Sequence, residues 1–195
     1  MLKGKISRFW SWLQAQKQLA MWPPDRALMA EIGARLHSLD ERLGVELTRR
    51  GDSTELAISA EGNRELVDLV RRIVGAAPSL PVSVVAFRQR GKVEAVTLEV
   101  ANGRRLSPED IWFRLERQPQ GLGLHLFVRD FPDEQPGECQ NAVYLLLDNA
   151  LGELDVMSIA WIEWARLPPA PETVGLAPLG QLPLSFDLAL GRALA

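Results

Sequence analysis

The chain twice places a helix pattern between two strand patterns, and this order restricts its fold more than any other feature. The first run is "TELAISA" (54–60), a helix in which Leu66, Val70 and Ile73 share a face, and "VSVVAFRQR" (82–90). The second run is "GLGLHLFVRDF" (121–131), a helix from about 136 to 151, and "SIAWIEWAR" (158–166). Each run is expected to form a right-handed crossover.

Two such units, with hairpin strands between them, predict an α+β fold with an antiparallel or mixed sheet and helices packed on it, ferredoxin-like or related. "VELTRR" (45–50) is expected to form a hairpin with the first strand through "GDS". A second hairpin, "VSVVAFRQR" with "VEAVTLEV" (93–100), would turn near Gly91. "LSPEDIWFRLERQ" fits either a helical turn leading into a strand or a short helix.

A length of 195 residues fits one domain overall. We expect an N-terminal amphipathic helix in residues 1–22, an α+β core in 23–167 and a proline-rich C-terminal wrap in 168–195. The wrap is expected to end in a short helix near 186–194.

Composition excludes several classes of protein. The net charge is −3 and no basic stripe is evident, so we expect no nucleic-acid partner. A single cysteine, Cys139, excludes an internal disulfide and is compatible with a cytoplasmic location. The N-terminus lacks the long apolar core of a signal peptide, and no apolar run of about 18 residues predicts a membrane span.

Ile6, Phe9, Trp10 and Leu13 fall on one face of the N-terminal helix, whose other positions include several lysines. We favour packing of this face on the rest of its own domain. The alternative is contact with a membrane surface or a partner through residues 2–20.

The sequence offers little support for catalysis. It contains no P-loop, GxSxG, HExxH or GxGxxG motif, and we expect no cofactor, metal site or catalytic residue. Of the two histidines, His37 is expected in solvent and His125 on a strand, opposite a leucine-rich face. Cys139 is expected to be a small buried apolar residue.

Charged residues are expected to meet where the last long helix gives way to a strand. In a ferredoxin-like arrangement this corner would contain five side chains, namely Arg88, Arg90, Asp148, Glu153 and Asp155. It could be a structural ion network, a divalent-cation site or a pocket for a small ligand or anion, and we favour the network. The second and third alternatives would make the protein an enzyme or a small-ligand binder.

The last strand raises a separate possibility. Trp161 and Glu163 share one of its faces, and we combine them with His125 as a possible partner surface. If that face is open, Trp161 is suited to protein binding. The alternative, which we favour, is that helices carrying Trp10, Trp12 and Trp22 cover it.

The motifs "FWSWLQAQKQL", "ISAEG", "AAPSLP" and "FRQR", followed by "NAVYLLLDNALGELDVMSIAWIEWARLP", resemble a bacterial family of domains of unknown function. Gln89 stands where that family is expected to have proline. In that family, some relatives are joined to a domain that resembles a protein inhibitor of a ribonuclease, and the resemblance therefore implies regulation through protein contacts. We therefore expect a non-catalytic cytoplasmic binding or regulatory module with a protein partner.

Overall fold

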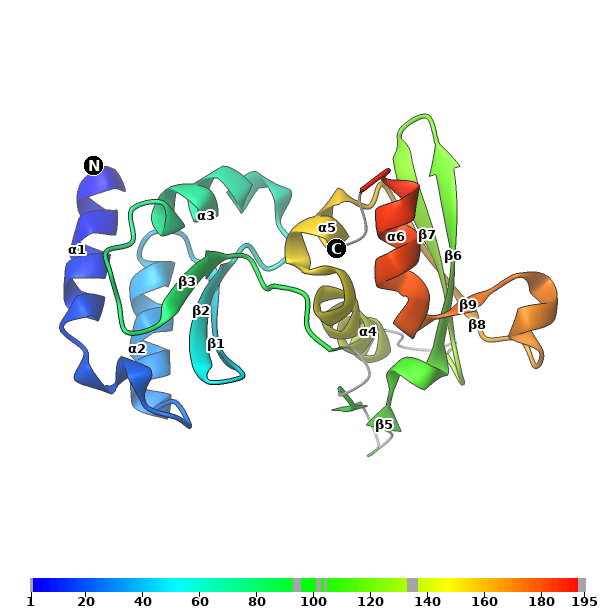
Figure 1. The fold of residues 1–195 in the computed structure, drawn as a ribbon, viewed down its shortest axis with the longest axis horizontal. Helices are drawn as coiled ribbons and strands as arrows, with labels where there is room; N and C mark the ends of the chain where they lie inside the picture. Colours follow the sequence, from blue (N-terminus) through cyan, green and yellow to red (C-terminus); the bar gives the residue numbers. More distant parts are fainter. Residues whose placement is uncertain (1, 93–95, 101–102, 104, 133–136, 193–195) are drawn as a thin grey trace. The chain divides into compact units, whose positions relative to one another are not determined.

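The structure is a computed structural model and describes residues 2–92, 96–100, 103, 105–132 and 137–192. The predicted α+β class is confirmed, since helices pack with mixed and antiparallel sheets. The chain divides into two compact units, Met1–Gln89 (unit 1) and Arg90–Ala195 (unit 2). The boundary falls inside the range 23–167 that we expected to be one core (Figure 1).

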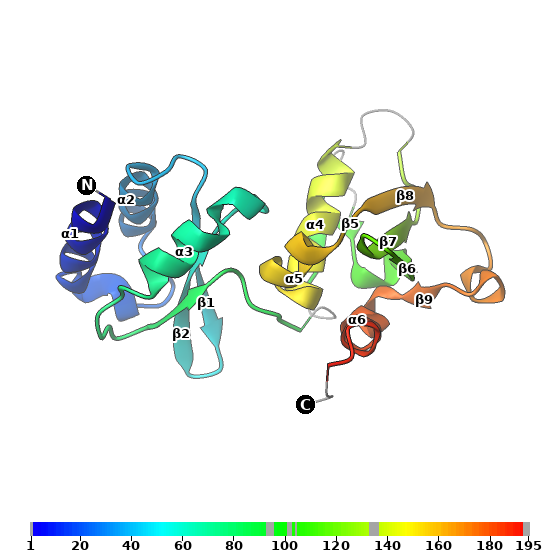
Figure 2. The same ribbon diagram turned by 90° about the horizontal axis from the view of Figure 1, so that it is seen from above.

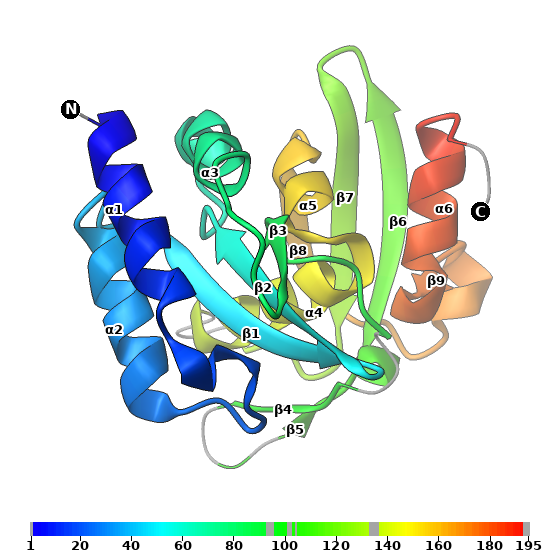
Figure 3. The same cartoon turned by 60° about the vertical axis from the view of Figure 1, so that its left-hand side comes forward.

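Unit 1 contains a three-stranded sheet with the order β1-β2-β3. Its elements are α1 (Leu2–Gln14), η1 (Lys17–Ala20), α2 (Arg26–His37), β1 (Gly44–Arg50), β2 (Ser53–Ser59), η2 (Arg64–Leu66), α3 (Val67–Val74) and β3 (Ser83–Ala86). Strands β1 and β2 form the expected antiparallel hairpin, and β2 runs parallel to β3. The first strand–helix–strand unit is therefore present (Figure 3).

Local sequence explains where the helices of unit 1 begin and end. The carboxylate of Asp25 caps α2 by accepting hydrogen bonds from the backbone N–H groups of Ala27 and Leu28. The side chain of Asn63 caps η2 in the same way, through the N–H of Glu65. Helix α2 ends at His37, and the chain then turns before β1 begins at Gly44.

The apolar face of α1 is buried within unit 1. Ile6, Phe9, Trp10 and Leu13 are at most 5 % exposed. The indole N–H of Trp10 donates to the backbone oxygen of Ile73 at 2.8 Å, which ties α1 to the end of α3. This packing follows the interpretation that we favoured for the N-terminal helix, and its apolar face is not exposed to lipid.

Unit 2 contains a four-stranded sheet with the order β8-β7-β6-β9 and a separate pair, β4-β5. Its elements are β4 (Leu98–Glu99), β5 (Arg105–Leu106), η5 (Pro108–Asp110), β6 (Ile111–Gln118), β7 (Gly121–Val128), α4 (Gly137–Leu151), α5 (Glu153–Ser158), β8 (Ile162–Arg166), η6 (Pro171–Val174), β9 (Ala177–Pro178), η7 (Leu179–Gln181) and α6 (Leu182–Ala189). Strand β7 pairs in parallel with β8, and α4 and α5 connect the two strands. The second strand–helix–strand unit is therefore also present.

One face of the unit 2 sheet carries α4, α5 and α6, and the connection that contains η6 lies on the other side (Figure 2). Alternate side chains of β7 point into the core, where Leu124, Leu126 and Val128 are fully buried with Val143 and Leu146 of α4. The alternation places Gly123, His125 and Phe127 on the opposite face.

Several expected pairings are wrong. Strands β3 and β8, from the two strand–helix–strand units, belong to different sheets. Strand β3 pairs with β2 and β4 pairs with β5, while residues 93–95 of the expected second hairpin lie outside the described residues. The segment from Leu106 forms a helical turn followed by a strand, which is the first of its two expected alternatives. The last strand begins later than expected, at Ile162, because α5 extends to Ser158.

Candidate functional site

Arg90 lies at the centre of a set of ion pairs in unit 2. Its Nη1 and Nη2 atoms donate to both carboxylate oxygens of Asp187, at 2.6 and 2.9 Å, and Nη2 also donates to Asp155 at 2.7 Å. Arg192 in turn binds Asp155 through both of its terminal nitrogens, at 2.6 and 2.7 Å. We call Arg90, Asp155, Asp187 and Arg192 the Arg90 network.

The pKa shifts in the Arg90 network favour its charged form. Hydrogen bonds from Arg90 lower the pKa of Asp187. Burial raises the pKa of Asp155, but hydrogen bonds from Arg192 and Arg90 outweigh that effect and the net shift is downward. The carboxylate of Asp187 also raises the pKa of Arg90. Two cations and two anions therefore neutralise one another, as expected for a structural network.

The same arginine stabilises the end of α4. Its Nε–H donates to the backbone oxygen of Leu151 at 2.8 Å, the last residue of the helix. A cation at a helix C-terminus interacts favourably with the helix dipole, and it offsets the unfavourable position of Asp148 in the last turn. The N–H of Gly152 donates to the backbone oxygen of Asp148, which closes the turn into α5.

Of the five residues of the predicted corner, the structure brings Arg90 and Asp155 together. Arg88 instead pairs with Glu46, at 3.2 Å, and with Glu61, all within unit 1. Glu153 is fully buried as the first residue of α5. Asp187 and Arg192, which sequence reasoning missed, come from the C-terminal segment, where no local pattern links them to Arg90.

The residues of the predicted partner surface meet on the sheet face opposite the helices. His125 on β7 lies between two carboxylates, with Nε2 at 2.8 Å from Glu116 of β6 and Nδ1 at 3.1 Å from Glu163 of β8. Both contacts can be hydrogen bonds at once only when both ring nitrogens carry hydrogen, as in the imidazolium form. The hydrogen bond with His125 lowers the pKa of Glu116, and one from Gln118 adds to this shift.

Trp161 covers the end of this cluster. A Cβ atom built on Gly123 would lie 2.0 Å from Cε2 of Trp161, so the indole ring occupies the space above that glycine. The same ring meets His125 edge to face, with centroids 4.8 Å apart. Its Nε1 atom is buried and has no hydrogen-bond partner among the described residues.

Further aromatic residues extend this surface along the sheet. Trp112 of β6 lies directly opposite Phe127 of β7, and both are half-buried. We call the following set the outer face: Trp112, Arg114, Glu116, His125, Phe127, Trp161, Glu163 and Ala165. Glu163 is 68 % exposed at its side chain, and Arg114 and Ala165 are also exposed. The outer face therefore combines aromatic area with accessible charges.

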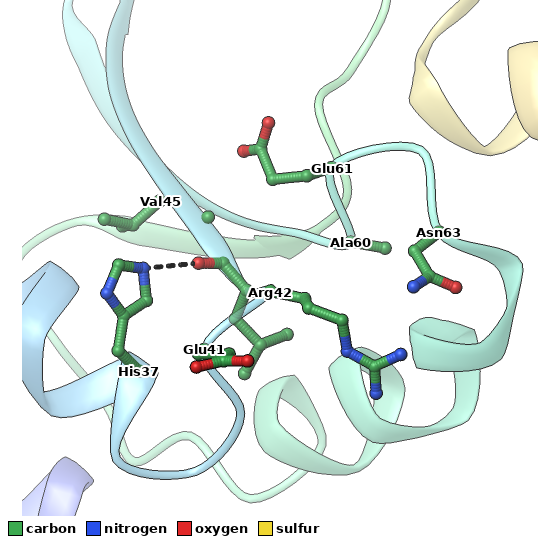
Figure 4. Close-up of a pocket in the computed structure, with 9 residues that line it drawn as sticks. His37, Glu41, Arg42, Val45, Ala60, Glu61 and Asn63 are labelled. Atoms are coloured by element: carbon green, nitrogen blue, oxygen red, sulfur yellow. Dashed lines mark hydrogen bonds between the residues drawn. The ribbon is translucent and has the colours of Figure 1, made fainter.

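Unit 1 contains a hollow of about 570 Å³ between the turn before β1 and the turn after β2 (Figure 4). Two of its polar side chains are already bound to other groups of unit 1. Nε2 of His37 contacts the backbone oxygen of Leu43, and Arg42 forms ion pairs with Asp40 and Glu65. Hydrogen bonds from Arg42 lower the pKa of Asp40 to about 2. His37 is exposed, as expected from the sequence, although its ring nitrogen contacts a backbone oxygen.

Other kinds of site find little support in the described part of the chain. No group of three or more His, Cys, Asp or Glu side chains there is placed to hold a metal ion. Cys139 is buried in the unit 2 core. Among the described residues, no helix is long and apolar enough to cross a membrane.

No family model, curated protein or solved structure matches this chain. The resemblance to a bacterial family therefore stays a prediction, and the function has to be argued from the geometry of the two units.

Proposed function

We propose that this protein is a non-catalytic binding or regulatory module of the bacterial cytoplasm, and that its outer face contacts a protein partner. The observation that carries this proposal is the position of Trp161, which packs on Gly123 and His125 instead of entering the hydrophobic core. Tryptophan is among the residues most enriched at energetically dominant positions of protein interfaces.

The surroundings of Trp161 support the same function. His125 is held between Glu116 and Glu163, so the polar groups next to the indole ring have a fixed geometry before a partner arrives. A pre-ordered surface loses less conformational entropy on binding. Glu163 and Arg114 provide accessible charges of opposite sign at its margin, which is typical of a polar rim.

The alternative of an enzyme or anion binder at the predicted corner has less support. Both arginines of the Arg90 network are engaged with aspartates, so an incoming anion would have to displace a carboxylate from each cation that it bound. The buried or paired acids also offer no cluster suited to a metal within the described residues.

Comparative affinity capture tests the proposal. The bait proteins are the wild type, an outer-face variant with Glu163→Arg and Ala165→Arg, and a control with Glu109→Arg and Thr97→Arg. Both variants alter two exposed positions of unit 2 and change the net charge equally. Bound proteins from native bacterial lysate are quantified by mass spectrometry.

The expected result is one protein captured in stoichiometric amount by the wild type and the control but lost with the outer-face variant. Binding of the purified partner should be at least about tenfold weaker for that variant, because a reversed charge at Glu163 and an added charge at Ala165 disturb the charge complementarity of the interface. A partner retained equally by all three baits, or a recurring small molecule with no protein, would contradict the proposal.

A further inference from the structure

A groove of about 700 Å³ lies in unit 1 between α1 and the end of α3 with the turn that follows it. It is lined by Lys3, Ile6, Ser7, Trp10, Ser11, Gln14, Arg72, Gly75, Ala76 and Pro78. A volume in this range is typical of ligand-binding pockets. No part of the groove belongs to the outer face or to the Arg90 network.

Hydrogen bonds hold the floor of the groove in place and engage the backbone groups at the end of α3. Trp10 lies in it with its indole N–H bonded to the oxygen of Ile73, the residue that precedes the last position of α3. The backbone N–H of Gly75 donates to the backbone oxygen of Arg71, and the N–H of Ala76 donates to the backbone oxygen of Ile73. Carbonyl groups at a helix C-terminus repel anions, and these hydrogen bonds reduce that effect here.

One wall of the groove is a polar stripe on α1. Lys3, Ser7, Ser11 and Gln14 are exposed and recur every three or four residues, so they lie along one side of the helix. The stripe is about 16 Å long at a rise of 1.5 Å per residue. An extended peptide of about five residues has the same length. The shape of the wall therefore fits a linear segment better than a compact small molecule.

The charge of the groove has one sign. Lys3 and Arg72 are its charged lining residues, both are exposed, and neither forms an ion pair within the described part of the chain. The neighbouring Arg71, by contrast, faces Asp68 at 3.9 Å. Unit 1 as a whole has 13 lysines and arginines against 10 aspartates and glutamates, although the complete chain is acidic.

We propose that this groove binds an extended acidic segment of a partner protein. Lys3 and Arg72 pair with carboxylates of the segment from opposite walls, because neither cation has an ion-pair partner among the described residues. Ser7, Ser11 and Gln14 hydrogen-bond to its backbone, whose N–H and C=O groups match hydroxyl and amide side chains. A small apolar side chain of the segment packs on Ala76 and Pro78. This interaction is separate from the one proposed for the outer face.

Selection from a random heptapeptide display library, with the full chain as bait, tests this proposal. The wild type should enrich sequences with at least two aspartates or glutamates. The best peptide is then labelled with fluorescein, and its affinity is measured by fluorescence anisotropy at low and high salt. A groove variant, Lys3→Glu with Arg72→Glu, is compared with a control, Lys17→Glu with Arg26→Glu, which changes the charge of unit 1 equally at exposed positions outside the groove.

We expect the groove variant to bind the acidic peptide at least about tenfold more weakly, because reversing a paired charge produces repulsion. The control should stay within about twofold of the wild type, and added salt should weaken wild-type binding. Circular dichroism and thermal unfolding verify that both variants are folded. Ser7→Ala with Ser11→Ala should weaken binding without altering its salt dependence.

Three results would overturn the proposal. The first is a library selection that yields no acidic sequences, and the second is an acidic peptide that binds the groove variant as tightly as the wild type. The third is binding of phosphatidylserine vesicles or duplex DNA through Lys3 and Arg72 without binding of any acidic peptide, which would assign the groove to a different class of ligand. None of these results bears on the outer face, which the affinity capture tests independently.

Discussion

Arg90 and Asp187 share two hydrogen bonds although they are 97 residues apart in the sequence. The first residue of unit 2 is thereby attached to α6, its last helix, and the same guanidinium binds the end of α4. Substitution of this one side chain should therefore disturb contacts among three segments that are distant in the chain.

Arg90→Gln should lower the free energy of unfolding of unit 2 by about 1–3 kcal/mol, because it removes the guanidinium that donates to Asp187 and to the Leu151 carbonyl, and one of the two cations that bind Asp155. The measurement is urea denaturation followed by circular dichroism. Arg71→Gln is the control, since its long, exposed contact with Asp68 should contribute less than about 0.5 kcal/mol. Equal effects of the two substitutions would show that the Arg90 network contributes little.

Asp187→Asn should make stability less sensitive to acid. The pKa of Asp187 is lowered in the folded state by Arg90, so its ionised form stabilises the fold above the pKa of the unfolded chain. That stabilisation is lost as the pH falls through the lower, folded pKa. Urea denaturation at pH 7 should therefore separate the variant from the wild type, and the difference should shrink below pH of about 4. A constant difference across that range would contradict this linkage.

Gly123→Ala should expel the indole ring of Trp161 from its position, because the new methyl group would overlap Cε2. We expect a loss of about 1–3 kcal/mol, as for other overpacked sites. The indole N–H resonance of Trp161, assigned by comparison with Trp161→Phe, should shift as its environment changes. An unchanged resonance would show that the ring does not lie over Gly123.

Gly33→Ala should have the opposite effect on stability. Gly33 lies inside α2, and a Cβ atom built there meets no atom within 4 Å apart from its chain neighbours and the adjacent backbone of the same helix. Alanine restricts the unfolded chain and favours a helix, which should stabilise unit 1 by about 0.4–1 kcal/mol. Thermal unfolding should show a higher midpoint than the wild type; a lower one would indicate that α2 packs more tightly on this side.

His125→Gln should raise the pKa of Glu116 toward its ordinary range, because the histidine is the main cause of the lowered value. Titration by carbon-13 NMR of the glutamate carboxyl groups measures this. Gln118→Ala should raise the same pKa by a smaller amount, since that hydrogen bond is the second cause. Ionised Glu116 stabilises the fold above the ordinary pKa of a glutamate, and this stabilisation is lost on acidification. The stability of the His125→Gln variant should therefore fall less on acidification than the stability of the wild type.

The α+β class could be predicted because alternation in β7 and helical spacing in α3 are local signals. The placement of β3 and β8 in separate sheets could not be predicted, because the pairing of β3 with β2 depends on contacts between distant residues. A short run such as "VSVVAF" carries no information about the strand beside it. Helix α5 was missed for a related reason: six residues are too few for a helical period to be told from a strand.

Some residues of the candidate sites could also be predicted from local sequence, and others could not. His125 and Glu163 lie at matched positions on adjacent parallel strands, so alternation along each strand was enough to suggest that they share a face. Glu116 completes that cluster from β6, where the segment was ambiguous between helix and strand. Asp187 and Arg192 could not be anticipated, because an ion pair between distant segments leaves no trace in local sequence.

The alternation of Arg88, Gln89 and Arg90 at the unit boundary has a consequence for how this chain can be rearranged. Arg88 pairs with acidic residues that precede the boundary in the sequence, whereas Arg90 pairs with acidic residues that follow it. A gene fusion, circular permutation or split-protein design that breaks the backbone between Gln89 and Arg90 would leave each arginine with its own counter-ions. A break two residues earlier would separate Arg88 from its carboxylates, and a break two residues later would separate Arg90 from its own.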